Sequence, residues 1–254
     1  MTKPVKQPFP SVCVVTLGCA KNQVDSELMS ASILREGFLF VPDPAEADVI
    51  LLNSCSFIRD AVEESLEYLD ALSRYKEEGR CRCLVLTGCL VERYGGELRT
   101  PLPQVDMFVG RKAMESMGTI LRRRMEGEAI GPFLCETPWE EPTPGWSPSQ
   151  ARQALGVWAY VKVAEGCSNR CAYCTIPQIR GPLVSRPTEE IRREVAHLGR
   201  SGVQEINLVA QDVAAYGREG NSTGTFPLPS LLRELHGIDE IGWIRLLYCH
   251  PAHV

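Results

Sequence analysis

The stretch A-Y-V-K-V-A-E-G-C-S-N-R-C-A-Y-C, residues 159–174, joins an expected buried strand to three cysteines within eight residues. The apolar run at 159–164 predicts the strand, and the chain then enters the cysteine loop directly. Cys167, Cys171 and Cys174 supply three thiolates, whereas a structural zinc site and a closed iron–sulfur cube each take four ligands. Three thiolates can hold three irons of a cube and leave the fourth open, which favours chemistry over a purely structural role.

Two other chemistries account for this loop less well. A zinc site would need a fourth ligand, and the next histidine, His197, lies far along the chain within an expected helix. A redox dithiol would use only Cys171 and Cys174 and would leave Cys167 without a role. We therefore expect an open iron–sulfur site in the loop.

The chain after the loop continues as helices and strands. Thr188 is expected to cap a helix whose first turn carries Glu189 and Glu190, two acidic residues that suit the positive end of the helix dipole. The buried face of this helix is expected to carry Ile191, Val195 and Leu198. A strand at 206–210, a helix at 228–236 and a strand at 243–248 are expected next. A parallel sheet that stops at an unpaired strand exposes its edge, so we expect a fragment or a truncated copy of a longer barrel-like domain.

The first half of the sequence also alternates apolar, β-branched runs with helical patterns. Strands are expected at residues 12–17, 49–52 and 84–86. The first helix between them is expected to begin near Asp25 or Ser26 and to end at Gly37, and the second to end at Gly79. The buried face of the second helix is expected to carry Val62, Leu66, Leu69 and Leu72. Such alternation predicts an α/β domain with three layers, a parallel sheet between helices.

A second set of three cysteines follows the strands of this half. One or two residues separate the end of an expected strand from each of Cys19, Cys55 and Cys89, and a small residue comes directly before each cysteine. The carboxyl ends of neighbouring parallel strands meet at one edge of a sheet, where ligands gather. Cysteine is also a common buried residue, but three matching positions favour convergence on one metal cluster.

Residues 126–157 contain five prolines among glycine, serine and glutamate, a composition typical of a semi-rigid linker. We therefore expect three segments: an α/β domain at 1–125, the linker at 126–157, and the start of a barrel at 158–254.

The charge and composition of the sequence argue against a nucleic-acid-binding, membrane-spanning or secreted protein. A net charge of −5 offers no broad basic surface for nucleic acid, and no apolar run approaches the roughly 20 residues of a membrane span. The N-terminus lacks the apolar core of a secretory signal. Eleven cysteines without export indicate a reducing compartment, so we expect a cytoplasmic protein that does not bind membranes.

The spacing C-x-x-x-C-x-x-C resembles that of the radical S-adenosylmethionine enzymes. Tyr173 matches the aromatic residue usual before the last cysteine, and the resemblance implies that it contacts the cofactor. This resemblance implies that Cys167, Cys171 and Cys174 bind a [4Fe-4S] cluster whose open iron chelates S-adenosylmethionine. It also implies that the second half of the chain is the first part of that family's partial (βα) barrel, which resembles a TIM barrel.

Further cofactor contacts are implied by the same resemblance. Gln211 and Asp212 follow the second strand of this half, where relatives hold the methionine end of the cofactor, although the glycine-glycine-glutamate form of that motif is absent. Independently of the resemblance, two roles are open for Lys162 and Arg180: they reach the cofactor or cluster, or they are solvated or salt-bridged. The sequence does not identify catalytic residues beyond the cluster ligands.

The two cysteine sets together resemble the methylthiotransferases of this superfamily. L-G-C-A-K-N-Q-V-D-S-E at 17–27 is similar to the branch that modifies an aspartate of small-subunit ribosomal protein twelve, as are I-P-Q-I-R-G at 176–181 and L-V-A-Q-D at 208–212. The resemblance implies two [4Fe-4S] clusters, S-adenosylmethionine, and an electron donor of the flavodoxin or ferredoxin type. It implies a methylthio group inserted at the β-carbon of the aspartate, with Cys19, Cys55 and Cys89 binding the sulfur-donating cluster.

Two alternatives stay open at this stage. The same chemistry could act on a tRNA adenosine, although the tRNA-modifying branch has phenylalanine before the glycine and glutamine-methionine-asparagine after the cysteine. The chain could instead be a non-catalytic, truncated iron–sulfur fragment. Relatives complete the barrel and add a small β-rich substrate-binding domain, and this sequence shows neither.

Overall fold

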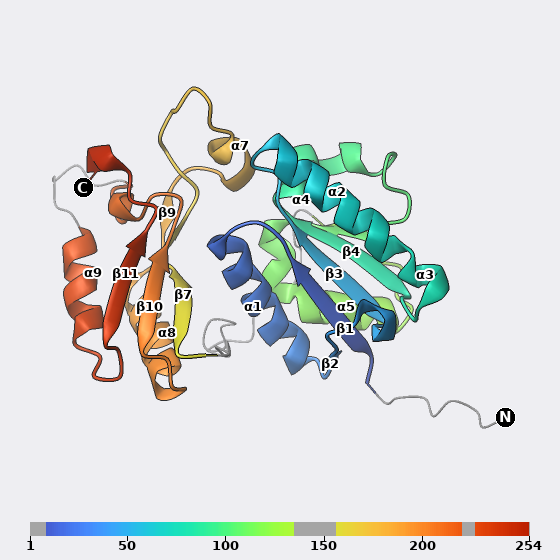
Figure 1. The fold of residues 1–254 in the computed structure, drawn as a ribbon, viewed down its shortest axis with the longest axis horizontal. Helices are drawn as coiled ribbons and strands as arrows, with labels where there is room; N and C mark the ends of the chain where they lie inside the picture. The colour runs from blue at the N-terminus through green and yellow to red at the C-terminus, as the bar shows by residue number, and fades with distance from the viewer. Residues whose placement is uncertain (1–8, 135–155, 220–226, 254) are drawn as a thin grey trace. The chain divides into compact units, whose positions relative to one another are not determined.

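Alternating strands and helices form two parallel sheets in the computed structural model, which describes residues 9–134, 156–219 and 227–253 (Figure 1). The residue contacts divide the chain into two units. The first unit comprises Met1–Gly18 with Leu28–Pro148, and the second comprises Cys19–Glu27 with Ser149–Val254. Most of the linker expected at 126–157 lies outside the described residues.

The sheet of the first unit has six parallel strands in the order β2-β1-β3-β4-β5-β6. The strands are β1 (Ser11–Thr16), β2 (Leu39–Phe40), β3 (Val49–Ser54), β4 (Cys83–Gly88), β5 (Met107–Val109) and β6 (Phe133–Leu134). Every residue of β3 and β4 is buried, as continuous apolar runs predict for strands covered on both faces.

Helices cover both faces of this sheet, because alternate strand residues point to opposite sides. The helices are α1 (Ala20–Arg35), α2 (Arg59–Ser73), α3 (Tyr75–Glu78), α4 (Cys89–Tyr94) and α5 (Met117–Met125), with 3-10 turns at Pro44–Glu46, Gly95–Leu98 and Arg111–Ser116. One core joins Leu69 of α2 and Leu90 of α4 to Ile50 of the sheet. The other joins Met29 of α1 and Ile120 of α5. The expected three-layer parallel-sheet domain is confirmed.

Several local expectations in this unit need correction. Helix α1 begins at Ala20, before Asp25 and Ser26, and the Asp25 carboxylate binds cationic side chains instead of capping the helix. On α2, Leu66 is 38% exposed, and Ser65 takes the buried position because it bonds to the backbone that follows β3. Strand β6 falls beyond residue 125, the expected end of the domain, and extends the sheet by pairing with β5.

The sheet of the second unit has three parallel strands in the order β11-β10-β7. The elements are β7 (Trp158–Lys162), β8 (Ala164–Glu165), α7 (Ile176–Arg180), β9 (Val184–Ser185), α8 (Thr188–Arg200), β10 (Glu205–Val209), α9 (Pro227–His236) and β11 (Trp243–Leu247), with 3-10 turns at Val213–Ala215 and Pro251–His253. This order of strands and helices matches the expected start of a (βα) barrel.

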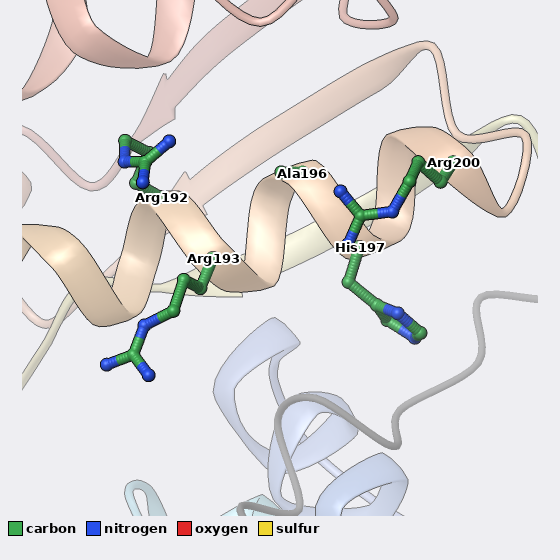
Figure 2. Close-up of a pocket in the computed structure, with 5 residues that line it drawn as sticks. All are labelled: Arg192, Arg193, Ala196, His197 and Arg200. Carbon is green, nitrogen blue, oxygen red and sulfur yellow. The ribbon is translucent and has the colours of Figure 1, made fainter.

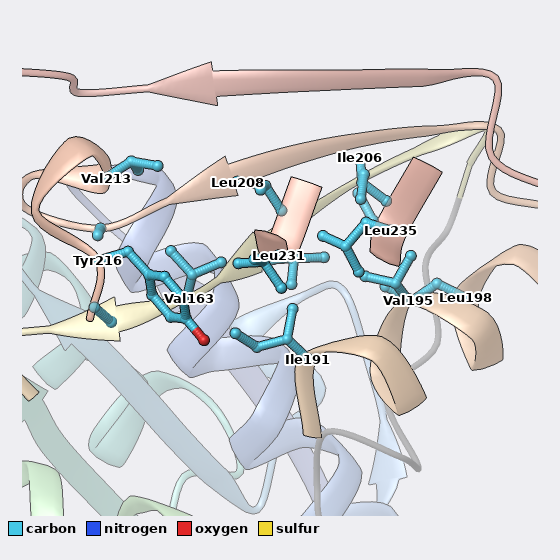
Figure 3. Packing of buried hydrophobic residues seen from close by; sticks show 14 of the residues in the cluster. Val163, Ile191, Val195, Leu198, Ile206, Leu208, Val213, Tyr216, Leu231 and Leu235 are labelled. Carbon is cyan, nitrogen blue, oxygen red and sulfur yellow. The ribbon is translucent and has the colours of Figure 1, made fainter. Parts of the chain in front are cut away.

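One hydrophobic core holds these elements together (Figure 3). Ile191, Val195 and Leu198 of α8 are fully buried, as their spacing predicts, and they pack with Leu231 of α9 and Leu208 of β10. The expected Thr188 cap is wrong, since α8 begins at Thr188 without a side-chain cap and its hydroxyl lies 3.1 Å from the hydroxyl of Tyr216.

Candidate functional site

Cys55 and Cys89 follow neighbouring strands of the first unit at paired positions. Ser54, the last residue of β3, pairs in register with Gly88, the last residue of β4, and a cysteine comes directly after each. Both cysteines are buried, at 8% and 7% exposure. The parallel register therefore places two of the predicted ligands at one edge of the sheet, as expected.

The backbone around these two cysteines is fixed by small residues. The Ser65 hydroxyl accepts a hydrogen bond from the Cys55 amide at 3.1 Å and donates to the Cys55 carbonyl at 2.9 Å. Gly88 has φ of +93°, and a Cβ there would lie 2.4 Å from Oδ1 of Asn53. Only glycine permits this close approach of the two strand ends. Ser65 and Gly88 therefore stabilise the backbone next to the two cysteines.

Cys19 opens a segment that belongs to the second unit. It follows Gly18, which has φ of +91°, and its carbonyl accepts a hydrogen bond from the Gln23 amide at 3.1 Å in the first turn of α1. The cysteine is half-buried and is three residues beyond the end of β1. Its participation in a cluster with Cys55 and Cys89 stays a prediction.

The tight cysteine set lies in a loop whose two ends are paired. Strands β8 and β9 are antiparallel, with Glu165 opposite Val184, so they bracket the cysteines. Cys167, Cys171 and Cys174 are all half-buried. The amide of Cys167 donates to the Gly181 carbonyl at 3.0 Å, and that of Cys174 to the Cys171 carbonyl at 3.0 Å. The loop is therefore a closed hairpin, not an extended connection.

The donor chemistry of this hairpin fits an iron–sulfur cluster. The Ile176 amide donates to the sulfur of Cys174 at 3.4 Å, the kind of hydrogen bond that tunes cluster thiolates. The hydroxyl of Thr175, next to that cysteine, is buried without a hydrogen-bond partner. Among the described residues, no three His, Cys, Asp or Glu side chains already converge as a metal site. The assignment of the six cysteines as ligands therefore stays a prediction.

The three predicted cofactor contacts occupy different environments. Tyr173 is 85% exposed, and its neighbour Cys171 raises the pKa of its hydroxyl by charge repulsion and a hydrogen bond. Gln211 donates to Glu165 at 3.1 Å, while its Oε1 is buried without a partner and could accept a bond from a ligand. Asp212 is buried, and both carboxylate oxygens already have protein partners.

A buried ion-pair network within the second unit borders the hairpin. Arg180, at the end of α7, contacts Asp25 at 2.9 Å, Glu165 at 3.3 Å and Asn22 at 2.6 Å. Lys162, at the end of β7, contacts Asp25 at 2.5 Å and Glu165 at 2.8 Å. The side chains of Arg180 and Asp25 are each 3% exposed. Two cations and two carboxylates thus compensate one another, which a buried charge requires.

This network decides between the two roles considered for Lys162 and Arg180. Burial acts to lower the pKa of Lys162, but the charges of Asp25 and Glu165 outweigh it and raise the pKa. Lys162 therefore stays charged near neutral pH and serves as an ion-pair partner. The sequence offered no signal that Asp25 would be its partner, because the two residues are far apart in the chain.

His197, considered above as a zinc ligand, lies on helix α8. It lines an open pocket with Arg192, Arg193 and Arg200, and Figure 2 shows these side chains along the same helix. Both Arg192 and Arg193 pair with Glu189 on their own helix. No cysteine in the described ranges lines this pocket with His197.

Comparisons with known proteins match each half of the chain to a family. Residues 11–110 match the model of the uncharacterized protein family UPF0004, and residues 161–251 match that of the radical SAM superfamily. The second match covers the cysteine hairpin and all three parallel strands of the second unit. Residues 161–251 are therefore similar to the radical SAM superfamily.

Nearly the whole chain is similar to curated methylthiotransferases. It is 45% identical over 95% of its length to the ribosomal protein uS12 methylthiotransferase RimO of Syntrophus aciditrophicus, strain SB. It is 43% identical over 94% of its length to RimO of Desulfitobacterium hafniense, strain Y51. The chain spans about half the length of these relatives, 53% of each. These matches confirm the resemblance to radical SAM methylthiotransferases that modify the ribosomal protein.

Solved structures with the same fold are more distant in sequence. The radical S-adenosylmethionine methyltransferase TsrM from Kitasatospora setae matches with a TM-score of 0.57 at 13% identity, over 89% of this chain and 50% of that chain. The cobalamin-dependent radical enzyme OxsB matches with a TM-score of 0.52 at 12% identity, over 90% of this chain and 37% of that one. They support the α/β fold class and nothing finer. In the part of the chain that the structure describes, no helix has the length and apolar character needed to cross a membrane.

Proposed function

We propose that this chain is part of a radical S-adenosylmethionine methylthiotransferase that inserts a methylthio group at the β-carbon of an aspartate in small-subunit ribosomal protein twelve. The observation that carries the proposal is the closed hairpin with three cysteines, in a chain 40–45% identical to RimO proteins over almost all of its length. The cysteines that follow β3 and β4 support a second cluster.

The six predicted cluster ligands and Gln211 each have a role in this proposal. Cys167, Cys171 and Cys174 hold one [4Fe-4S] cluster, and Gln211 offers its free Oε1 to S-adenosylmethionine. The second cluster takes Cys19, Cys55 and Cys89 as ligands. When bound, the clusters and S-adenosylmethionine supply the radical that removes hydrogen from the substrate, together with the sulfur and the methyl group of the product. Glu165 orients Gln211 by accepting its amide hydrogen bond at 3.1 Å.

The proposal also implies two partners, a protein substrate and an electron donor. The substrate is the ribosomal protein, and a carrier of the flavodoxin or ferredoxin type provides electrons. Both occur in the cytoplasm, where the cysteine-rich sequence would stay reduced. The net charge of −5 suits a basic ribosomal protein better than tRNA.

Iron content after anaerobic reconstitution gives the first test. We expect about eight irons per chain for the parent and about four when Cys167→Ala or Cys89→Ala removes a ligand of one cube. The matched control is Cys13→Ala, which removes a buried core cysteine outside both sets and should leave the iron content unchanged. Zinc in place of iron, or equal iron in all variants, would contradict the ligand assignment.

The mass of the ribosomal protein gives the second test. This chain and a full-length relative are each expressed in a strain that lacks the modification, and ribosomal protein twelve and tRNA are analysed by mass spectrometry. The proposal expects methylthio-aspartate in the protein from the full-length relative, and release of 5′-deoxyadenosine by the reduced chain itself. Methylthio-adenosine in tRNA would support the alternative substrate. Full iron content without release of 5′-deoxyadenosine would identify a non-catalytic fragment.

A further inference from the structure

The Asp212 carboxylate is buried next to the cysteine hairpin, although it was expected to contact the cofactor. Asp212 follows β10 by three residues, and its side chain is only 3% exposed. A carboxylate without solvent needs hydrogen-bond donors, because an unpaired buried charge is strongly unfavourable. The donors that surround it therefore indicate its role.

Three donors from two separate segments of the second unit satisfy this carboxylate. Oδ2 accepts a hydrogen bond from the side-chain amide of Asn169 at 3.3 Å, and Nδ1 of His253 lies 2.5 Å from the same oxygen. Oδ1 accepts a hydrogen bond from the backbone amide of His250 at 3.1 Å. Both oxygens of Asp212 are thus engaged by the protein, whereas Oε1 of the adjacent Gln211 has no partner.

Asn169 lies within the hairpin, between the first and second cysteines of the tight set. Two neighbouring hydrogen bonds stay within the hairpin: the Cys167 amide donates to the Gly181 carbonyl, and the Ser168 hydroxyl accepts from the Leu183 amide at 3.1 Å. The Asn169 bond is different, because it reaches a residue beyond β10. It ties the part of the loop that carries the first two thiols to the edge of the parallel sheet.

The other two donors come from the turn after β11. Within this turn, the Ala252 amide donates to Nδ1 of His250 at 3.2 Å, and from outside the turn Arg218 donates to the His253 carbonyl at 3.0 Å. Asp212 and His253 also line one small cavity together with Cys167 and Asn169. The carboxylate therefore joins the cysteine loop to the turn at the edge of that cavity.

We infer that Asp212 is a positioning residue, which holds Asn169 and the turn at His250–His253 so that the hairpin presents its cysteines in one fixed arrangement. This inference rests on the proposed function, since it assumes that the cysteines bind a cluster. The inference also gives two adjacent residues different roles. Gln211 offers a free acceptor to the cofactor, whereas Asp212 acts on the cysteines through the loop.

The test measures the loop both with and without iron. In iron-free protein, Asp212→Asn should speed backbone hydrogen exchange in a peptide that spans 166–175. The reason is that the substitution replaces one carboxylate oxygen by a side-chain NH2 group, which cannot accept a hydrogen bond from Asn169 or His253. After reconstitution, the same variant should hold its cluster about 10-fold more weakly, the size of effect typical of groups that orient metal ligands. Its reduced cluster should give an altered electron paramagnetic resonance spectrum. The KM for S-adenosylmethionine should stay unchanged in the fraction that retains the cluster.

A reciprocal pair of variants checks the specific bond. Asn169→Asp puts two carboxylates together and should weaken iron retention more than Asn169→Ala. The double variant Asn169→Asp with Asp212→Asn again pairs one amide donor with one carboxylate acceptor. It should therefore recover part of the iron retention that Asn169→Asp loses. Asn169 is half-buried and in a loop, so its variants should fold even if the Asp212 variant does not. The matched control is Asp239→Asn at an exposed site on the same unit.

Two results would overturn the inference. The first is unchanged exchange in the 166–175 peptide of iron-free Asp212→Asn. The second is a normal cluster spectrum combined with a raised KM for S-adenosylmethionine, which would make Asp212 a cofactor contact. Failure of the proposed function is a separate result, because the parent chain would then bind no iron while the exchange measurement on iron-free protein still tests the loop.

Discussion

Cys83, at the start of β4, shows how the sheet interior affects a single ionisable group. Its side chain is fully buried, and burial raises the pKa of its thiol to about 12, with a smaller contribution from Asp106. The unfolded chain releases this proton near the ordinary value of 9.0 and the folded chain does not. The stability contributed by the protonated thiol is therefore complete below pH 9 and is lost as the pH rises toward 12.

We expect Cys83→Ala to make the decline of stability above pH 9 less steep, by up to about 1.4 kcal/mol per pH unit. The measurement is the free energy of unfolding in urea between pH 8 and 10.5. Val85→Ala is the control on the same strand: it should lower stability by a similar amount at every pH, because valine does not ionise. Parallel curves for the parent and Cys83→Ala would show that this thiol ionises freely in the folded chain.

At the residue scale, the sequence predicts the positions of side chains that are set by their neighbours along the chain. The position of the cysteine loop directly after a strand and the paired positions of Cys55 and Cys89 follow from spacing and strand order. The partners of Asp25 and Asp212 could not be predicted, because their donors come from distant segments that only the folded chain brings together.

Two glycines of the hairpin allow the effect of backbone shape to be separated from that of close packing. Gly166 and Gly181 have φ of +71° and +78°, so both disfavour a side chain. A Cβ at Gly166 would lie 2.0 Å from the Pro182 carbonyl oxygen, whereas a Cβ at Gly181 would meet nothing within 4 Å. Only the first substitution forces the paired ends of the loop apart.

We expect Gly166→Ala to abolish iron binding at the hairpin, and Gly181→Ala to cost only the backbone strain of about 1–3 kcal/mol. Iron content and the thermal midpoint of each purified variant measure the two effects. Similar iron loss in both variants would mean that φ alone, and not contact with the Pro182 carbonyl, controls the hairpin.

At the element scale, long periodic segments were predictable and short ones were not. The apolar spacing of α8 correctly gave its buried face. Strands β5 and β6 contain three and two residues, too few for a pattern, and they form because β4 and β5 offer free backbone groups beside them. The start of α1 was misplaced because a polar residue that resembles a cap was in fact an ion-pair partner.

At the scale of the whole molecule, separate hydrophobic cores stabilise the two sheets. Leu198 belongs to the core of the second unit, and Leu86 to a core of the first. We expect Leu198→Ala to cost about 2–5 kcal/mol and to speed hydrogen exchange in β10, with little change in β3. Leu86→Ala should give the opposite distribution. Exchange that rises equally in β3 and β10 for both variants would show a single cooperative unit.

The paired ends of β3 and β4 also limit how this sequence can vary in length. Because Ser54 and Gly88 are in register, deleting one residue from either strand would turn its buried side chains to the opposite face and draw one cysteine back from the other. Insertions and deletions among relatives should therefore avoid 49–55 and 83–89 and gather in the connections outside them. A homologue of altered length within either segment would have to lose its cysteine pair or rebuild the sheet.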